Sequence, residues 1–231
     1  RLYAGKPVVI KPKSTNFGLG ITILKHNYDE TDFKAALQIA FEHDNTVLIE
    51  KFIPGREFRI FIINDEVVGI LHRVPANVTG DGVLNIGQLI DRKNEDPLRG
   101  KGYRTPLEKI RKGREEEMFL KQQGMDFNTV PKEREVVYLR ENSNISTGGD
   151  SIDFTDDIDD SYKAIAVEAA KALNVKITGL DMMIQDIHAP ATPDNYAIIE
   201  MNFNPAIHIH CYPFKGKNRH LNHKMIKALG F

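Results

Sequence analysis

The sequence has a single cysteine and almost no net charge, and both shortages argue against several classes of protein. Cys211 has no second cysteine with which to form an internal disulfide, which fits a reducing compartment such as the cytoplasm. The 31 Lys and Arg residues nearly balance the 32 Asp and Glu residues, so no strong field favours nucleic acid or an anionic membrane. No apolar run is long enough to cross a bilayer. We therefore expect a cytoplasmic protein that binds neither nucleic acid nor membrane.

Hydrophobic residues make up 41% of the 231 positions, which is enough for one large domain or two smaller lobes. Their pattern predicts strands at 8–10, 21–24, 47–49, 58–63, 67–74, 135–139, 177–185 and 196–203, and helices at 31–41, 84–93, 106–123, 160–173 and 219–229. Several strands are joined by short turns, so we expect largely antiparallel sheets and an α+β fold. The Pro54-Gly55 turn suggests a boundary between a lobe of residues 1–54 and a lobe of residues 55–231.

Three oxygen-bearing side chains near the C-terminus form a candidate metal site. Glu200 and Asn202 are two residues apart on a predicted strand, so their side chains point to the same face. If this strand pairs with the preceding one through a turn at 189–193, Asp181 lies opposite Glu200. Carboxylate and amide oxygens suit Mg²⁺, which also keeps water and nucleotide phosphates as ligands. The alternative is a solvated sheet face, but acids flanked by apolar residues are costly to bury unless they are paired or metal-bound.

The N-terminal part carries weaker signals for a nucleotide. Lys11 ends a predicted strand and can reach a phosphate, and the Gly-containing loop 14–20 can bring backbone N–H groups close to phosphate oxygens. The segment 50–57 runs into the Pro54-Gly55 turn, where a hinge could contact adenine and ribose. On composition alone, a simple hairpin turn and a charged linker explain these two segments better.

Two further regions are candidates for contacts with substrate or phosphate. The loop 140–150 is dense in hydrogen-bond donors, and Arg140 offers a planar fork to a carboxylate or phosphate, although the loop can also cap its own backbone. Arg73, within a predicted strand, can face phosphates or pair with an acid. The histidines near Cys211 fit no common closed zinc site, so surface or structural roles explain them better. These histidines are His208, His210, His220 and His223.

Taken together, these segments resemble the ATP-grasp superfamily over essentially the whole chain. The matching motifs, in order, are Val9-Ile10-Lys11-Pro12, a small Gly loop, Glu50 with Glu57, Asp181, and Glu200-Met201-Asn202-Phe203-Asn204-Pro205. Segments 73–82 and 94–100 are similar to cyanophycin synthetases and to the fused bacterial γ-glutamylcysteine ligase/glutathione synthetases. Segments 139–153 and 213–217 are more similar to the fused glutathione enzymes. The resemblance implies an ATP-grasp fold, in which two α+β lobes flank a nucleotide cleft.

The resemblance also implies a role for each matching residue. On the nucleotide side, Lys11 would contact phosphate, and a flexible flap over the phosphates would include Ser14, Gly18 and Gly20. Adenine would lie against Glu50, Lys51 and Ile53, and ribose would bind Glu57. On the catalytic side, two Mg²⁺ ions, with Mn²⁺ as an alternative, would be held by Asp181, Glu200 and Asn202. The transferred phosphoryl group would be steadied by Arg73 and Arg140. The peptide substrate would be lined by Asn142, Asn144, Gly148 and Gly149.

The implied reaction joins γ-glutamylcysteine to glycine at the expense of ATP, through an acyl phosphate, to give glutathione. The alternative is a cyanophycin synthetase-type ligase that extends a peptide. The chain begins with Arg1, and the upstream domain and second nucleotide-binding lysine of the family are not found before Lys11. We therefore expect a piece of a longer protein, with a γ-glutamylcysteine ligase domain upstream. A homodimer is compatible with the resemblance.

Overall fold

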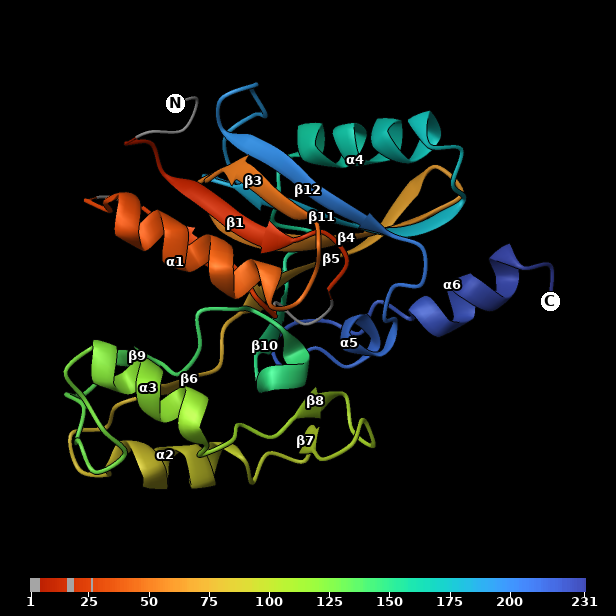
Figure 1. Cartoon of the computed structure of the whole chain (residues 1–231). Helices are drawn as coiled ribbons and strands as arrows, with labels where there is room; N and C mark the ends of the chain where they lie inside the picture. The colour runs from red at the N-terminus through yellow and green to blue at the C-terminus, as the bar shows by residue number, and fades with distance from the viewer. Residues whose placement is uncertain (1–4, 16–18, 26) are drawn as a thin grey trace. The chain divides into compact units, whose positions relative to one another are not determined.

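Two units make up the chain, Arg1–Pro54 and Gly55–Phe231. The computed structural model describes residues 5–15, 19–25 and 27–231 (Figure 1). None of the helices in these ranges is long and apolar enough to span a membrane.

The first unit packs one helix against a three-stranded antiparallel sheet. Its strands β1 (Val8–Pro12), β2 (Thr22–Leu24) and β3 (Val47–Lys51) lie in the order β2-β1-β3. Helix α1 (Glu30–Phe41) buries Ala36 and Ala40 against Val8 and Ile10 of β1. The helix begins before the predicted position because the side chain of Asp29 accepts hydrogen bonds from the backbone N–H groups of its first turn.

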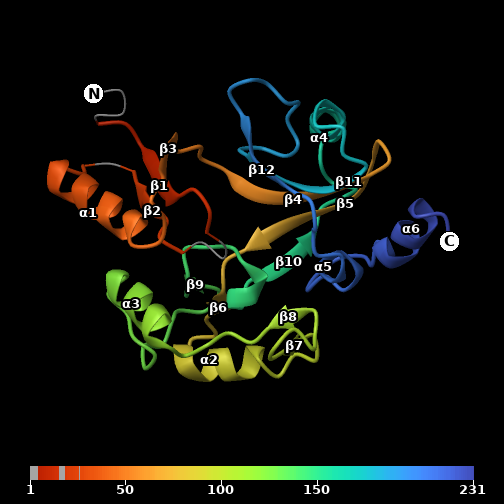
Figure 2. The same cartoon turned by 45° about the vertical axis from the view of Figure 1, so that its right-hand side comes forward.

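The second unit is built on a five-stranded antiparallel sheet with the order β10-β5-β4-β11-β12. These strands are β4 (Arg56–Ile63), β5 (Glu66–Val74), β10 (Asp150–Asp153), β11 (Ile177–Ile184) and β12 (Tyr196–Asn202). Helix α4 (Asp160–Ala172) packs on one face through the largest apolar cluster of the unit. The short helix α5 (His208–Cys211) and α6 (Leu221–Ala228) pack against the other face (Figures 1 and 2).

A smaller layer with its own apolar core is inserted between β5 and β10. It contains β6 (Asn77–Thr79), α2 (Ile86–Lys93), β7 (Arg99–Gly100), β8 (Leu107–Glu108), α3 (Arg114–Gln122), β9 (Val136–Tyr138) and the 3-10 helix η1 (Ile145–Thr147). Helices α2 and α3 lie below the central sheet in both views (Figures 1 and 2). The mixture of helices with almost wholly antiparallel strands confirms the α+β prediction.

The predicted helix at 106–123 is wrong over its first half. Leu107 and Glu108 form β8, which pairs in parallel with β7. The helix proper begins after Gly113, whose backbone N–H donates to the side chain of Glu116 at 3.0 Å. Strand pairing and a glycine N-terminus therefore override the charged pattern that favoured a longer helix.

The C-terminal helix also begins later than predicted, at Leu221. Arg219, expected as its first residue, instead forms ion pairs with Asp153 and Asp156. These contacts tie the segment before α6 to strand β10 and the turn that follows it.

Candidate functional site

A cluster of charged side chains occupies the face of the central sheet that is turned away from α4. Successive residues of a strand point to opposite faces, and the apolar set of β4 and β11 packs toward α4. Arg59 and Asp181 therefore point the other way, and they face each other in the register of β4 and β11. Glu57 and Arg73 extend the same face along β4 and β5. Four charges are thus collected on one side of three adjacent strands.

Asp181 is the centre of this cluster, and its side chain is 2% exposed. Both of its carboxylate oxygens accept hydrogen bonds from Arg59, and Nη2 of Arg73 donates to Oδ2 at 3.0 Å. Burial alone would raise the pKa of Asp181. The hydrogen bond from Arg59 and the positive charges of both arginines outweigh that effect and hold the pKa below its usual value. Asp181 is therefore ionised near neutral pH.

Glu57 joins the cluster through Arg73, with which it forms an ion pair. The hydroxyl of Ser143 donates to Oε2 of Glu57 at 2.6 Å, and the ring of His72 lies 3.0 Å from the Glu57 carbonyl oxygen. Nε of Arg73 is buried and has no hydrogen-bond partner among the described residues. Glu57, which the resemblance assigns to ribose, thus links the arginine on β5 to the loop that precedes η1.

Glu200 and Asn202 lie on the edge strand β12, beside Asp181. Glu200 pairs in register with Asp181, which confirms the expected strand alignment, and Asn202 pairs with Gly179. Nδ2 of Asn202 donates to Oε1 of Glu200 at 3.2 Å, so the amide oxygen of Asn202 is turned away from that hydrogen bond. The structure therefore brings the three predicted metal ligands together on neighbouring strands.

The chemistry of this set fits a hard divalent cation. Glu200 lies directly opposite Asp181 in the register of β11 and β12 and influences the pKa of Asp181, so the two carboxyl groups are close neighbours. Two adjacent carboxylates repel each other when both are ionised, unless a proton or a cation is shared between them. Within the described ranges, no three His, Cys, Asp or Glu side chains are grouped as a metal site. A cation at this position would therefore depend on the Asn202 oxygen and on ligands from outside the protein, such as phosphate oxygens.

Arg140 lies in a different ion-pair cluster from Arg73. Its Nε donates to Oε1 of Glu116 at 2.6 Å, and its guanidinium also forms an ion pair with Glu115. The side chain of Glu116 is 1% exposed, so the start of α3 holds Arg140 firmly. The two arginines predicted to act together thus have different carboxylate partners.

The predicted substrate-binding loop has a defined internal structure. The hydroxyl of Thr147 is within hydrogen-bond distance of two acceptors, Oδ1 of Asn142 at 2.8 Å and the carbonyl oxygen of Asn144 at 2.9 Å. Gly148 has φ of 92°, a conformation that favours glycine, and the N–H of Gly149 donates to the Asn144 carbonyl oxygen at 3.2 Å. The loop capping expected as the alternative is present.

The nucleotide residues assigned to the first unit lie on β1, on β3 and in the loops next to them. Nζ of Lys11 forms an ion pair with Glu50 at 2.7 Å across the β1–β3 pair. Ser14 donates its N–H to Asp44 at 2.8 Å. Gly20 has φ of 75°, and a Cβ there would lie 2.7 Å from the side chains of Pro12 and His43. Of the remaining predicted residues, Lys51 ends β3, Ile53 follows it half-buried, and Gly18 lies outside the described residues.

The C-terminal histidines do not form a metal centre within the described residues. His210 is fully buried against the ring of Phe61, at 5.4 Å between centroids, and neither ring nitrogen has a hydrogen-bond partner in the described part of the chain. Burial, helped by the positive charge of Arg59, lowers the pKa of His210 to about 3. His210 is therefore a neutral packing residue, as the structural interpretation of the histidines expected.

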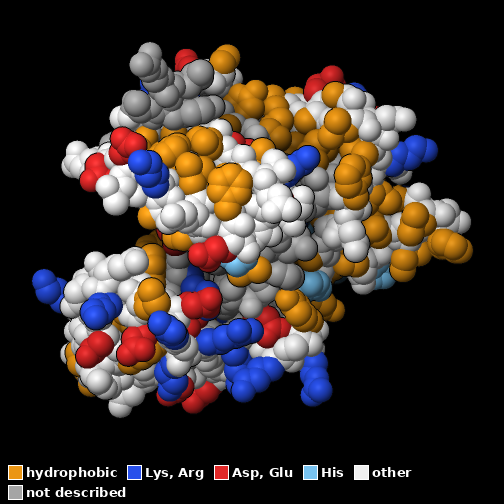
Figure 3. Space-filling model, in the orientation of Figure 1, with side chains coloured by type: hydrophobic (Ala, Val, Ile, Leu, Met, Phe, Trp, Pro, Cys, Tyr) orange, Lys and Arg blue, Asp and Glu red, His pale blue; other side chains and the backbone are white. Residues whose placement is uncertain are grey.

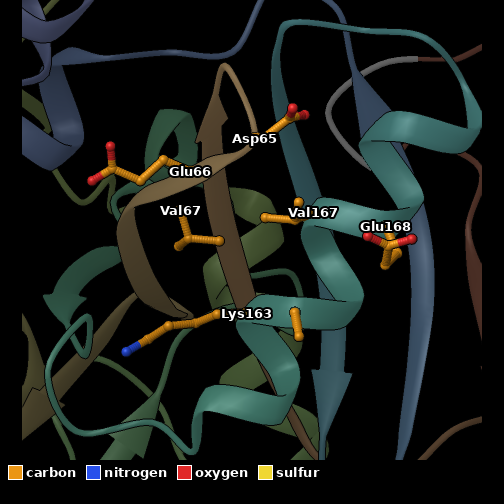
Figure 4. Close-up of a pocket in the computed structure, with 7 residues that line it drawn as sticks. Asp65, Glu66, Val67, Lys163, Val167 and Glu168 are labelled. Atoms are coloured by element: carbon orange, nitrogen blue, oxygen red, sulfur yellow. The ribbon is translucent and has the colours of Figure 1, made fainter.

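A shallow pocket on the opposite side of the sheet does not belong to this cluster. It has a volume of about 410 Å³ and lies between the β4–β5 turn and α4 (Figure 4). Asp65, Glu66 and Glu168 contribute acids to it, and Lys163 contributes a cation that is already paired with Asp160 at 2.8 Å. Because α4 covers the other face of the sheet, none of these groups can reach Asp181.

The motifs and the geometry agree with the comparisons with known proteins. The family model described as D-ala D-ala ligase C-terminus matches residues 3–85. The chain is 63% identical, over 99% of its length, to the glutathione biosynthesis bifunctional protein GshAB of Desulfotalea psychrophila. It is 57% identical, over the same share, to the GshAB protein of Clostridium perfringens. This chain belongs to the ATP-grasp ligase family.

A solved structure supports the ATP-grasp assignment. The crystal structure of a bifunctional glutathione synthetase from Pasteurella multocida is 48% identical, with a TM-score of 0.74 over 98% of this chain. The chain spans 31% of that protein and 29% of each of the two GshAB relatives. The recognised family, the ATP-grasp fold and the α+β class predicted from the sequence are thus confirmed.

Several residues of the buried charged clusters were not predicted from the sequence. Arg59 stands in an apolar strand, and only its position two residues from Glu57, on the same face, could have indicated its role. Ser143 was one polar residue among many in its loop. Asp150, Arg99 and Lys93 form a buried cluster that strand and helix patterns do not reveal, because their partners come from distant segments.

Proposed function

We propose that this chain is the ATP-dependent module that joins γ-glutamylcysteine to glycine in the synthesis of glutathione. The observation that carries the proposal is the convergence of Asp181, Glu200 and Asn202 on adjacent strands beside two arginines. The bifunctional glutathione-biosynthesis relatives support the choice of substrates. They also support an upstream γ-glutamylcysteine ligase domain in a longer cytoplasmic polypeptide.

Both units carry residues that we assign to ATP. We assign the phosphates to Lys11 and to the loop with Ser14, Gly18 and Gly20, and the base and sugar to Glu50, Lys51, Ile53 and Glu57. Mg²⁺ held by Glu200, Asn202 and Asp181 would neutralise charge on the phosphate oxygens. Because Lys11 already pairs with Glu50 at 2.7 Å, nucleotide would replace that carboxylate as the partner of the lysine.

The reaction would proceed by carboxylate activation. The carboxylate of γ-glutamylcysteine that will be joined to glycine attacks the γ-phosphorus of ATP. The bond between the γ-phosphorus and the β–γ bridging oxygen breaks, and ADP leaves. The amine of glycine then attacks the acyl phosphate, phosphate leaves, and the amine loses a proton as the amide forms. Arg73 and Arg140 would face the transferred phosphoryl group. The preorganised guanidinium of Arg73, held by Glu57 and Asp181, would stabilise the charge that develops there.

The substrate loop would hold the dipeptide. Asn142 and Asn144 would offer amide groups, and the Gly148-Gly149 turn would line the same site. No side chain has to act as a covalent nucleophile in this scheme. Catalysis would come from position and fixed charge.

The test uses the polypeptide at its natural length with ATP, Mg²⁺, γ-glutamylcysteine and glycine, and it measures the peptide product together with ADP. We expect equal amounts of ADP and of the tripeptide, and little product when aspartate or arginine replaces glycine. Extension of an aspartate-containing peptide in place of γ-glutamylcysteine would instead identify a cyanophycin synthetase-type ligase. ATP binding without turnover of any amine would refute the proposed reaction.

A further inference from the structure

A second buried ion-pair cluster joins the inserted layer to strand β10. Asp150 of β10 accepts hydrogen bonds from Arg99 of β7, from Nζ of Lys93 at 2.7 Å and from Nδ2 of Asn77 at 3.0 Å. The side chain of Arg99 is completely buried and that of Asp150 is 6% exposed. The ring of Phe214 lies beside both cations, at 5.2 Å from Lys93 and 5.4 Å from Arg99. Four elements and a loop therefore meet at one carboxylate.

Arg99 also makes contacts that the other members of this cluster do not. Its Nη1 donates to the carbonyl oxygen of Gly148 at 3.0 Å and to that of Glu108 at 2.9 Å. Arg99 thus connects Asp150 with the turn that ends the predicted substrate loop and with strand β8. A planar guanidinium can satisfy three acceptors in fixed directions, whereas a lysine ammonium on a flexible stem cannot hold the same geometry.

The turn at Gly148 is held from its other side as well. A Cβ at Gly148 would lie 2.8 Å from Cα of Ile110, and one at Gly149 would lie 2.8 Å from the carbonyl oxygen of Val74. The backbone of the turn is therefore packed directly against two other segments. With Arg99 donating to the Gly148 carbonyl oxygen, the turn has little freedom to move.

The segment that Arg99 secures at Glu108 lines an open surface hollow. The hollow has a volume of about 660 Å³, and its wall runs from Lys101 to Lys112 with α2 on the other side. Lys and Arg side chains gather on this part of the surface (Figure 3). Arg99 therefore fixes the position of two neighbouring surfaces at once, the turn at Gly148 and the wall beyond Glu108.

We propose that Arg99 is a positioning residue for the peptide substrate. It holds the Gly148-Gly149 turn in the shape that presents Asn142 and Asn144 to γ-glutamylcysteine, while taking no part in nucleotide binding. This inference rests on the proposed function, because it names the residue on which that function's peptide site depends. Asp150 serves as the buried counter-charge that keeps Arg99 in place.

The variant Arg99→Lys tests the inference, in the polypeptide of natural length. We expect the KM for γ-glutamylcysteine to rise by about tenfold or more, because a turn displaced by even a fraction of an ångström misplaces the substrate. The KM for ATP should stay within about twofold of the wild-type value. A general loss of folding would instead lower the yield of active protein and would leave both KM values unchanged.

Lys93→Met is the matched control. Lys93 is paired with the same carboxylate, Asp150, but it does not contact Gly148. We expect Lys93→Met to lower thermal stability at least as much as Arg99→Lys, and to leave both KM values close to wild type. A rise in the dipeptide KM in both variants would mean that loss of stability, and not loss of the contact with Gly148, explains the effect.

Hydrogen exchange gives a readout that does not depend on ligation. The Gly148 N–H donates to the Ile145 carbonyl oxygen at 3.1 Å and the Gly149 N–H to that of Asn144 at 3.2 Å. Both should exchange faster in Arg99→Lys and at the wild-type rate in Lys93→Met. Unchanged exchange in Arg99→Lys would overturn the inference. Faster exchange, in a polypeptide whose wild type forms no peptide, would overturn the proposed function and leave the contact of Arg99 with the turn established.

Discussion

Replacing Asp181 by asparagine tests the buried part of the site most directly. The change keeps the size of the side chain but removes the negative charge and one of the two oxygens that accept hydrogen bonds from Arg59 and Arg73. Arg59 is itself buried, with 7% exposure, so solvent cannot replace the lost partner. Breaking a buried pair by removing one partner typically costs about 3–5 kcal/mol. We expect a loss in this range, because two guanidinium groups face Asp181.

Urea unfolding followed by circular dichroism measures this loss. The midpoint should fall while the slope with urea stays constant, because the surface exposed on unfolding does not change. Asp156→Asn is a suitable control, since Asp156 also pairs with an arginine but is half exposed, and exposed pairs contribute little. A loss for Asp181→Asn no larger than the loss for Asp156→Asn would refute the claim that the Arg59–Asp181–Arg73 group stabilises this unit.

Asp181→Asn should also change how the free energy of unfolding depends on pH. The pKa of Asp181 is lower in the folded protein than its unfolded value of about 3.9, so its contribution is fully present above that value. The contribution disappears as the pH falls from about 4 toward the folded pKa. The difference in unfolding free energy between wild type and Asp181→Asn should therefore be constant near neutral pH and shrink below about pH 4. A difference that grew on acidification would contradict the assigned charge state.

Two further substitutions separate catalysis from packing. Glu200→Gln should abolish ligation with little change in stability, because an exposed carboxylate next to Asp181 is replaced by a neutral group. Turnover by this variant at the wild-type rate would refute the metal assignment. His210→Leu should flatten the loss of stability on acidification. The pKa of His210 is about 3 in the folded protein, so below about pH 6.5 only the unfolded chain takes up a proton at this position. This uptake lowers the free energy of unfolding by about 1.4 kcal/mol for each pH unit. Unfolding measured at several pH values should show that this contribution to the slope is missing in His210→Leu.

The parts of the fold that were predicted correctly have long and regular apolar patterns. Strands β4, β5, β11 and β12 each carry enough alternating or continuous apolar residues to fix their type and their approximate ends. The connection at 185–195 between β11 and β12 then determined their alignment, and Glu200 is indeed opposite Asp181. A period of two residues was thus enough to bring together two carboxylates and an amide that lie at positions 181, 200 and 202.

The elements that were missed or misjudged are short, and contacts with distant residues hold them in place. Strand β10 is four residues long and carries Asp150 and Asp153, whose partners Arg99 and Arg219 are far away in the sequence. Strand β8 is two residues long, and its pairing with β7 removed half of a predicted helix. No periodicity can be measured over so few residues, so only tertiary contacts decide their structure.

The charge balance of the cluster explains how this sheet face can bury four charges and remain stable. Glu57 and Asp181 are ion-paired with Arg73 and Arg59, so these four charges largely cancel and can be buried together. Glu200 stands outside that arrangement, since among the described residues it forms no ion pair with a basic side chain, and it lies at the exposed edge strand. One uncompensated carboxylate, one amide oxygen and an Asp181 carboxylate that is already shared with two arginines are too weak a ligand set to retain a divalent cation without further oxygens. We therefore expect the metal to arrive and leave with the nucleotide phosphates, while the buried arginine–carboxylate group keeps the sheet in place throughout.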